Sequence, residues 1–318
     1  MVSPSFSSLV GQPQAVALLS QAIACDRIAP AYLFAGPPGV GRSLAARAFL
    51  ECLTSRSEPS TRHLENHPDL LWIEPTYSHQ GKLITVSEMI AKGEPLPRTR
   101  PQVRLAQIRQ ITQFLSQTPL EGTRLLAVID QAETMAEAAA NGLLKTLEEP
   151  GNATLILIAP SSDALLSTLV SRCQRIPFYR LSDRHLRQVL TEQGHEPILD
   201  DPDLLAIAQG SPGAAITSWT QQQAIPPDLL QSCQQRFQSP RSCLELARQI
   251  EQTLDPETQL WLINYLQQTY WRLYRQANLL QILEQAKQYL GHYAQPRLVW
   301  EVTLLSLYER LGTLSVSF

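Results

Sequence analysis

The sequence predicts an α/β fold whose parallel sheet is covered by helices on both faces, followed by an all-helical C-terminal part. Three observations predict it. In the first half, short apolar runs without polar alternation are separated by helical patterns, which is typical of parallel strands buried on both faces. The strand signal ends near Tyr179, and helical patterns continue to near Leu311. Hydrophobic residues form 44% of the 318 positions and charged residues 17%, a composition that excludes a disordered protein.

Four apolar runs are expected to form the sheet. The predicted strands are Ala31–Ala35, Leu70–Ile73, Leu125–Ile129 and Thr154–Ala159. Between them we expect three helices, Ser43–Leu53, Val103–Gln117 and the Ala-rich Ala136–Leu147. Residues 75–102 contain several prolines and basic side chains without clear periodicity, and this predicts an exposed insertion. The polar and then Pro-rich stretch Gln221–Pro227 is expected to be a linker between helical regions.

Charge and cysteine content narrow the classes of function. The net charge is −3, and the part after residue 180 holds 10 basic and 14 acidic side chains, which disfavours a broad nucleic-acid surface there. One acid-free stretch, residues 95–120, carries Arg98, Arg100, Arg104 and Arg109; a solvated face is favoured over contact with DNA phosphates or a partner. Five scattered cysteines without a C-x-x-C pair predict inert thiols. No apolar run has the length of a membrane helix, which predicts a cytoplasmic protein.

A phosphate-binding loop is predicted between the first strand and the helix that follows it. Residues 36–43, GPPGVGRS, match the pattern G-x-x-x-x-G-K-[ST] except at one position. Glycines let backbone N–H groups converge on phosphate oxygens, and the Ser43 hydroxyl would bind Mg²⁺. The exception is Arg42, which replaces the lysine. Because a guanidinium is larger, planar and differently directed, this replacement is not conservative.

The strand Leu125–Ile129 is expected to carry the metal side of the same site. Its following residue, Asp130, suits a water-mediated Mg²⁺ contact. Gln131 comes next, where many ATPases of this type have a glutamate that polarises the attacking water, and an amide cannot accept that proton. Glu133 is nearby but two positions away. The expected degenerate nucleotide site therefore consists of Gly36, Gly39, Gly41, Arg42, Ser43, Asp130 and Gln131.

Several motifs together resemble the clamp-loader branch of the AAA+ proteins. They are LVGQ at residues 9–12, the loop at 36–43, HPD at 67–69, IDQAE at 129–133, NGLLKTLEEP at 141–150 and SRC at 171–173. The resemblance covers roughly residues 6–218. It implies a nucleotide-type AAA+ domain over residues 1–179, with the insertion at about 75–102, a helical lid over 180–223 and a helical collar that oligomerises over 224–318.

Within that family the chain is most similar to the delta-prime, or stator, class of the bacterial DNA polymerase III clamp loader. The resemblance implies partners: a delta subunit, three gamma or tau subunits, the beta sliding clamp, and primed DNA reached through the complex. It implies a role in ATP-driven clamp loading during replication as part of the polymerase holoenzyme, and a nucleoid location through the replisome. It also implies that Arg172 of the SRC motif acts as an arginine finger on ATP held by a neighbouring subunit.

Departures from the motor subunits favour the stator class. The phosphate-loop lysine and the glutamate after Asp130 are both missing, and Gly213 stands where motor lids carry a sensor arginine. We therefore expect no intrinsic ATPase activity and no required cofactor, with weak ATP and Mg²⁺ binding left open. The four-cysteine zinc module of many relatives is absent; Cys52, His63 and His67 fall short of a closed site, so no metal is expected.

The sequence leaves alternatives open both for the class of the protein and for the role of Arg172. The first alternative class is an ATP-hydrolysing motor subunit of the clamp loader, or another AAA+ DNA remodeller such as a helicase-type protein. A small P-loop kinase is more distant, because it explains neither SRC nor the helical C-terminal third. The second alternative concerns Arg172, which could instead cap a helix or pair with an acid in its own domain.

Overall fold

The computed structural model describes residues 6–54, 67–79, 82–92, 97, 99–149, 151–292 and 295–314. The chain divides into two compact units, Met1–His185 and Leu186–Phe318. Among the described residues, no helix combines the length and the apolar character needed to cross a membrane. The finer division into a lid and a collar, with boundaries at 179 and 223, stays a prediction.

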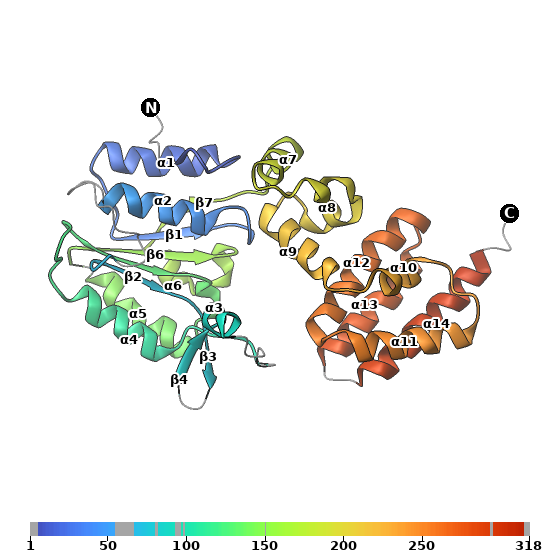
Figure 1. The fold of residues 1–318 in the computed structure, drawn as a ribbon. Coiled ribbons are helices and arrows are strands. Elements are labelled where there is room, and N and C mark those ends of the chain that lie inside the picture. Colours follow the sequence, from blue (N-terminus) through green and yellow to red (C-terminus); the bar gives the residue numbers. More distant parts are fainter. Residues whose placement is uncertain are drawn as a thin grey trace. The chain divides into compact units, whose positions relative to one another are not determined.

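The first unit is built on a five-stranded parallel sheet with the order β2-β5-β6-β1-β7 (Figure 1). Its strands are β1 (Ala31–Ala35), β2 (Leu70–Ile73), β5 (Leu125–Ile129), β6 (Ala153–Ala159) and β7 (Gln174–Pro177). Its helices are α1 (Pro13–Ala24), α2 (Arg42–Thr54), α4 (Leu105–Leu115), α5 (Glu137–Glu148) and α6 (Ser167–Val170), with the short 3₁₀ turns η3 (Ala132–Thr134) and η4 (Ser162–Ala164).

Side-chain alternation along β1 explains the two helical layers. Ala31, Leu33 and Ala35 of β1 belong to the core that includes apolar residues of α4 and α5. Tyr32, which lies between them in the sequence, makes an edge-on ring contact with Phe49 of α2. Figure 1 shows α1 and α2 over one face of the sheet and α4 and α5 over the other. Because both faces are covered, β1, β5 and β6 are buried at every position, as continuous apolar runs predict.

All four predicted strands are confirmed, but β7 was not predicted. Its sequence, Gln174-Arg175-Ile176-Pro177, has two exposed polar residues and a proline, so it lacks an apolar run. Proline is tolerated there because β7 is the edge strand next to β1.

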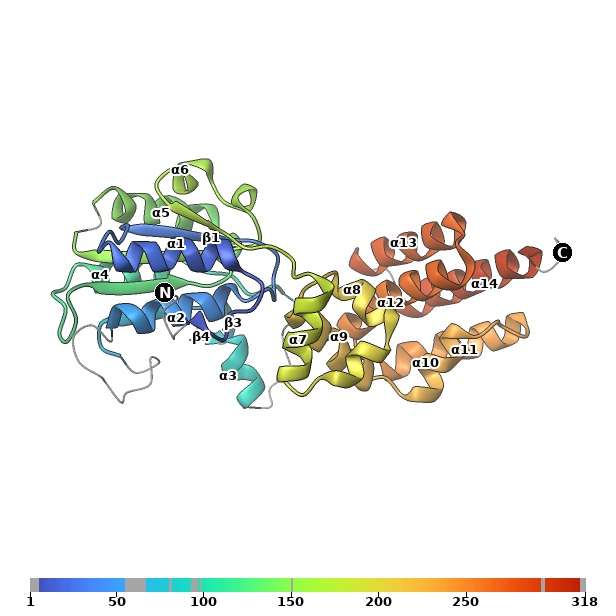
Figure 2. The same ribbon diagram turned by 90° about the horizontal axis from the view of Figure 1, so that it is seen from above.

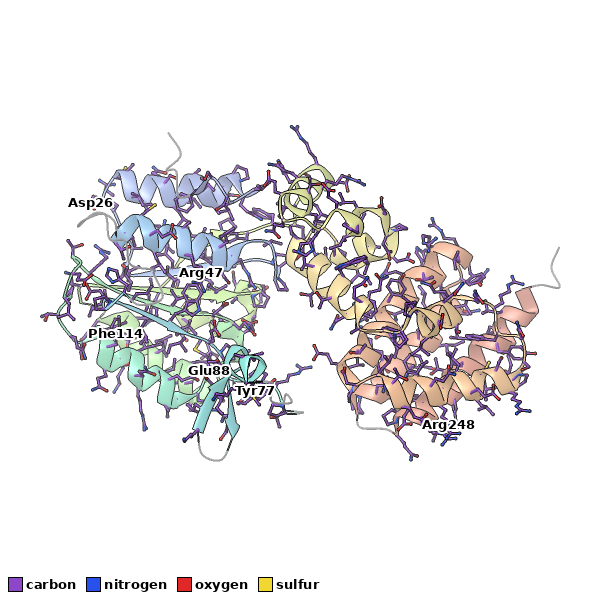
Figure 3. The ribbon with its side chains drawn as sticks, in the orientation of Figure 1. Asp26, Arg47, Tyr77, Glu88, Phe114 and Arg248 are labelled. Carbon is purple, nitrogen blue, oxygen red and sulfur yellow. The ribbon has the colours of Figure 1, made fainter. Side chains whose placement is uncertain are left out.

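The insertion is more regular than the sequence indicated. It forms an antiparallel hairpin, β3 (Thr76–His79) and β4 (Lys82–Thr85), followed by helix α3 (Val86–Ala91). Tyr77, Ile84 and Met89 build a small core of their own, and Tyr77 and Glu88 are labelled in Figure 3. Thr85 and Glu88 exchange side-chain and backbone hydrogen bonds that cap α3. The hairpin was missed because neither of its strands is a continuous apolar run.

The second unit is entirely helical in its described part, and Figure 2 displays its helices along their lengths. It begins within α7 (Asp183–Glu192) and continues with η5 (Glu196–Asp200), α8 (Pro202–Ala208), α9 (Pro212–Gln223), α10 (Pro227–Gln234), α11 (Pro240–Thr253), α12 (Pro256–Tyr274), α13 (Ala277–Gly291) and α14 (Pro296–Leu314). The expected linker is shorter than predicted: α9 reaches Gln223 and α10 starts at Pro227. Six of the seven α-helices from α8 onward have proline as their first residue, where its missing N–H costs no hydrogen bond. The exception is α13, which starts with alanine.

Candidate nucleotide-type site

The loop between β1 and α2 has the backbone of a phosphate-binding loop. Gly39 and Gly41 have φ of 73° and 102°, which side-chain-bearing residues rarely adopt. Gly36 is required for another reason: a Cβ there would lie 2.3 Å from the carbonyl oxygen of Phe178, which follows β7. The pattern of glycines therefore serves both the shape of the loop and its close packing against the edge of the sheet.

Asp130 and Ser43, the two expected Mg²⁺ contacts, bind each other. The Ser43 hydroxyl donates to Asp130 Oδ2 at 3.1 Å, and the Gln131 backbone N–H donates to Oδ1 at 2.8 Å. Gln131 has a left-handed backbone with φ of 49°, and its side chain is exposed. The structure thus brings β5 and α2 together as the sequence predicts, with both carboxylate oxygens of Asp130 already engaged.

Arg42 is buried inside this site, with 8% of its surface exposed. Burial lowers the pKa of its guanidinium, and the carboxylates of Glu133 and Asp130 act in the opposite direction. Burial likewise raises the pKa of Glu133, while the Arg42 charge opposes that rise. Arg42 Nη1 and Glu133 Oε2 are both buried and lack a hydrogen-bond partner. In the sequence, Glu133 lies two positions after Gln131, the position where many ATPases of this type have a catalytic glutamate. The turn η3 brings the charge of Glu133 close to Arg42.

These residues fit a magnesium–nucleotide complex poorly. A metal ion beside Ser43 and Asp130 would be repelled by the positive guanidinium of Arg42, which already interacts with Asp130. In the part of the chain that the structure describes, no group of three or more acidic, histidine or cysteine side chains is placed to hold a metal ion. The loop backbone suits an anion, and Gln131 cannot accept a proton where many ATPases have a glutamate.

Arg172 lies after α6, away from the phosphate loop in the sequence, and has partners in its own domain. Its Nη2 donates to Glu148 Oε1 at 2.7 Å and its Nη1 donates to the Thr168 carbonyl at 2.9 Å. The two side chains of the ion pair are 37% and 51% exposed. An exposed pair of this kind contributes about 0–1 kcal/mol, so exchange for another anion costs little.

The remaining candidates are structural where the chain is described. Gly213 lies at the start of α9, where the Ser211 hydroxyl accepts the Ala214 N–H at 3.1 Å. His67 accepts the Asp69 N–H through Nδ1 at 3.1 Å, while His63 lies outside the described residues. Arg98, one of the four arginines of the acid-free stretch, lies outside them too. Burial raises the pKa of the Cys173 thiol to about 11 and that of Cys233 to about 12, which disfavours the reactive thiolate form.

Comparison with known families decides the class of this protein. The sequence pattern of the family described as "DNA polymerase III, delta subunit" matches residues 11–182, more than half of the chain. The pattern described as "Cyanobacterial DNA polymerase III delta prime, C-terminal domain" matches residues 184–307. This chain belongs to the DNA polymerase III delta-prime family. The second match covers the helical region for which the sequence motifs supplied only length and helical character.

Curated relatives agree with the delta-prime family. The chain is 34% identical over 198 residues to DNA polymerase III subunit delta' of Bacillus subtilis, covering 58% of this chain and 53% of that protein. It is 31% identical over 216 residues to the delta' subunit of Pseudomonas aeruginosa, covering 63% and 58%. The tau/gamma subunit of Haemophilus influenzae is 26% identical over 218 residues, covering 66% of this chain and 29% of the relative. The matched part thus spans about half the length of the two delta-prime relatives.

The fold also has a counterpart among solved structures. A crystal structure of a DNA polymerase III gamma-subunit-related protein from Thermotoga maritima aligns with a TM-score of 0.54 and 19% identity, covering 93% of this chain and 99% of that one. At this identity the comparison supports the fold alone: an α/β core followed by helices. The predicted fold class is confirmed.

Proposed function

We propose that this delta-prime family member is the stator subunit of a clamp loader, which assists ATP-driven loading of the beta sliding clamp onto primed DNA. Its proposed partners are a delta subunit and gamma or tau subunits, which would supply the ATP. One observation carries the stator role: the phosphate loop is intact in its backbone but its chemistry is replaced, with Arg42 buried against Asp130 and Glu133.

The alternative is a motor subunit that hydrolyses ATP itself. Three replacements oppose it, because Arg42, Gln131 and Gly213 each remove a group that motor subunits use. We propose that ATP and Mg²⁺ are not required for folding or assembly and that no zinc is bound. The expected ATP turnover of the purified chain is at background and unchanged by Ser43→Ala. Turnover comparable to that of a tau or gamma subunit, lost on Ser43→Ala, would establish the motor alternative.

Arg172 is the proposed contribution of this chain to catalysis in the complex. Its guanidinium would leave Glu148 and bind the γ-phosphate of ATP held by a neighbouring subunit, where bidentate contacts stabilise the transition state. The support is the exposed, readily exchanged ion pair on the surface beside α6, together with the family's SRC motif. An arginine finger can contribute about 10³–10⁵ in rate at its own site. Because a complex has several ATP sites and only one would lose its arginine finger, the fall in the rate of the whole complex is smaller.

The test is Arg172→Ala in a complex reconstituted with delta, tau or gamma, clamp and primed DNA. We expect normal assembly with reduced clamp loading and reduced ATP turnover. Arg175→Ala is the matched control, because Arg175 is an exposed arginine on β7 three residues away. Glu148→Gln separates the roles: a structural ion pair would make both partners equally important, whereas a finger acting in trans does not need Glu148. Unchanged loading by a correctly assembled Arg172→Ala complex would refute the proposal.

A further inference from the structure

The LVGQ segment at residues 9–12 connects two loops that lie far apart in the sequence. It ends at Gln12, the N-cap of α1, so it is fixed to a helix that covers one face of the sheet (Figure 1). The function proposed above gives this segment no role. Its side chains nevertheless contact both the phosphate loop at residues 36–43 and the chain that follows β7.

The Gln12 side chain, which is 2% exposed, makes the hydrogen bonds of this connection. Its Nε2 donates to the Val40 carbonyl in the phosphate loop at 3.2 Å and to the Tyr179 carbonyl at 2.6 Å. Its Oε1 accepts the Tyr179 N–H at 3.1 Å. Because Tyr179 is the second residue after β7, the glutamine amide pairs with its main chain as a neighbouring strand would, and its other N–H reaches the phosphate loop.

Close packing strengthens the connection on both sides of the segment. On the loop side, a Cβ at Gly41 would lie 2.8 Å from Cδ1 of Leu9, which is buried against the loop backbone. On the other side, a Cβ at Gly11 would lie 3.0 Å from Leu181 Cγ and 3.2 Å from His185 Nδ1. Groups packed this closely transmit a displacement instead of absorbing it.

These contacts form one continuous path within the first unit. It runs from His185 in the first turn of α7 through Gly11 and Gln12 to Val40. Ser182 Oγ lies 3.1 Å from His185 Nδ1, which fixes the ring beside the segment. The chain enters the second unit directly after His185. The path therefore joins the phosphate loop to the residues from which the second unit continues.

We propose that residues 9–12 form a latch, with Gln12 as its positioning residue, that couples the phosphate loop to the start of α7. A change at either end reaches the other, because coupling is reciprocal and is carried by contiguous hydrogen bonds and packed side chains. A glutamine with a purely structural role would stabilise both segments, but neither segment would respond to a change in the other. The latch belongs to the chain itself and does not rest on the role in clamp loading.

NMR of the full chain with ¹⁵N-labelled glycine tests the coupling. The amide signals of Gly39 and Gly41 report on the phosphate loop, and that of Gly151, whose surroundings are open, is an internal control. The perturbation is His185→Ala, which removes the ring that packs on the latch. We expect the Gly39 and Gly41 signals to shift and the Gly151 signal to stay. Arg184→Ala is the matched control, because Arg184 is exposed, and it should shift none of the three.

The same substitution in a Gln12→Leu background identifies the role of Gln12. Leucine fills a similar volume but bonds neither Val40 nor Tyr179, so most of the shift that His185→Ala causes in the loop should be lost. Gln12→Asn, which is shorter by one methylene, serves the same purpose if Gln12→Leu does not fold. Gln14→Leu is the control, an exposed glutamine of α1 whose replacement should leave the shift intact.

Hydrogen exchange reads the other end of the latch. The Tyr179 amide should exchange about tenfold faster in Gln12→Leu, from the loss of its hydrogen bond. If His185→Ala in the otherwise unchanged chain leaves the Gly39 and Gly41 signals in place, the coupling does not exist, whatever the Gln12 variants do. A loop shift that persists undiminished in both Gln12 variants that fold, or an unchanged Tyr179 exchange rate, would overturn the role of Gln12.

Discussion

At the scale of single residues, Asp69 shows how one carboxylate can order a loop. Its Oδ1 accepts the Leu120 N–H at 2.6 Å, and its Oδ2 accepts the N–H groups of Glu121 and Gly122 at 2.8 and 2.6 Å. The side chain is buried, with 1% of its surface exposed. This gives the HPD segment a physical role in the chain: Asp69, placed just before β2, fixes the turn that leads into β5. The sequence pattern located the segment but not the turn that it holds.

We predict that Asp69→Asn lowers the free energy of unfolding of the first unit by about 1–3 kcal/mol at neutral pH, because the amide loses charge and turns an NH₂ toward N–H donors. Burial opposes ionisation, but the three N–H groups hold the pKa of Asp69 below its usual value. Asp69 therefore stabilises the fold above the pKa of the unfolded state, and this stabilisation is lost as pH falls through the lower folded-state pKa.

Urea unfolding at pH 7 and near pH 3 checks this prediction. The two proteins should differ most at pH 7, and the difference should shrink as the pH falls toward the lowered folded-state pKa of Asp69. Asp163→Asn, which changes an exposed aspartate, should stay within about 0.5 kcal/mol of the wild type. A difference between wild type and Asp69→Asn that persists undiminished at low pH would mean that the charge is not the cause.

At the scale of elements, α8 and α12 are joined by a polar stripe. Asp203 on α8 is 2% exposed and accepts a bidentate pair from Arg272 at 2.8 and 2.9 Å and a third bond from Thr269 at 2.8 Å. Tyr265, one turn before Thr269 on α12, lies within 3.4 Å of the other aspartate of this region, Asp201. Burial and both aspartates raise the pKa of Tyr265 to about 12, so it stays a hydrogen-bond donor.

We predict that Arg272→Met destabilises the second unit by about 2–3 kcal/mol, because it leaves the Asp203 carboxylate buried with only Thr269 as its charge-stabilising donor. The guanidinium is itself half exposed, which keeps the cost below that of a fully buried pair. Arg241→Ala on α11 is the comparison: its ion pair with Glu245 is exposed on both sides, and its loss should cost about 0.5 kcal/mol or less. Thermal unfolding of both variants measures the contrast, and equal losses would refute it.

Differences between the elements also explain which parts of the fold could be predicted from the sequence. Strands β1, β5 and β6 were found because burial on both faces leaves continuous apolar runs, and the phosphate loop because glycine is needed at Gly39 and Gly41. Edge strand β7 and the hairpin of the insertion carry no such signal. In the site, the sequence identified Arg42 as a replacement, but its burial beside Glu133 depends on contacts between α2 and η3 that no local pattern records.

At the scale of the whole chain, the two units differ in whether a truncated fragment of each would still fold. The first unit holds the complete sheet and both helical layers. Its family match ends at residue 182 and the next begins at residue 184, near the boundary between the units at His185. In the second unit, helices far apart in the sequence depend on one another, because α12 supplies the hydrogen-bond donors to Asp203 of α8. The boundary near 185 is therefore a better place to divide the chain than the end of α9.

We predict that a fragment of residues 1–182 folds cooperatively, whereas extending it to residue 221 adds helices that do not fold stably. In the longer fragment Asp203 would lose Thr269 and Arg272, and the buried Leu204 and Ala208 of α8 would lose the covering helix. Hydrogen exchange measures both: amides of β1, β5 and β6 should keep their protection in both fragments, while those of α8 fall to opening free energies near 0 kcal/mol in the longer one. If the α8 amides are as well protected in the longer fragment as in the full chain, α8 does not depend on α12. If the shorter fragment does not unfold cooperatively, the first unit does not fold independently.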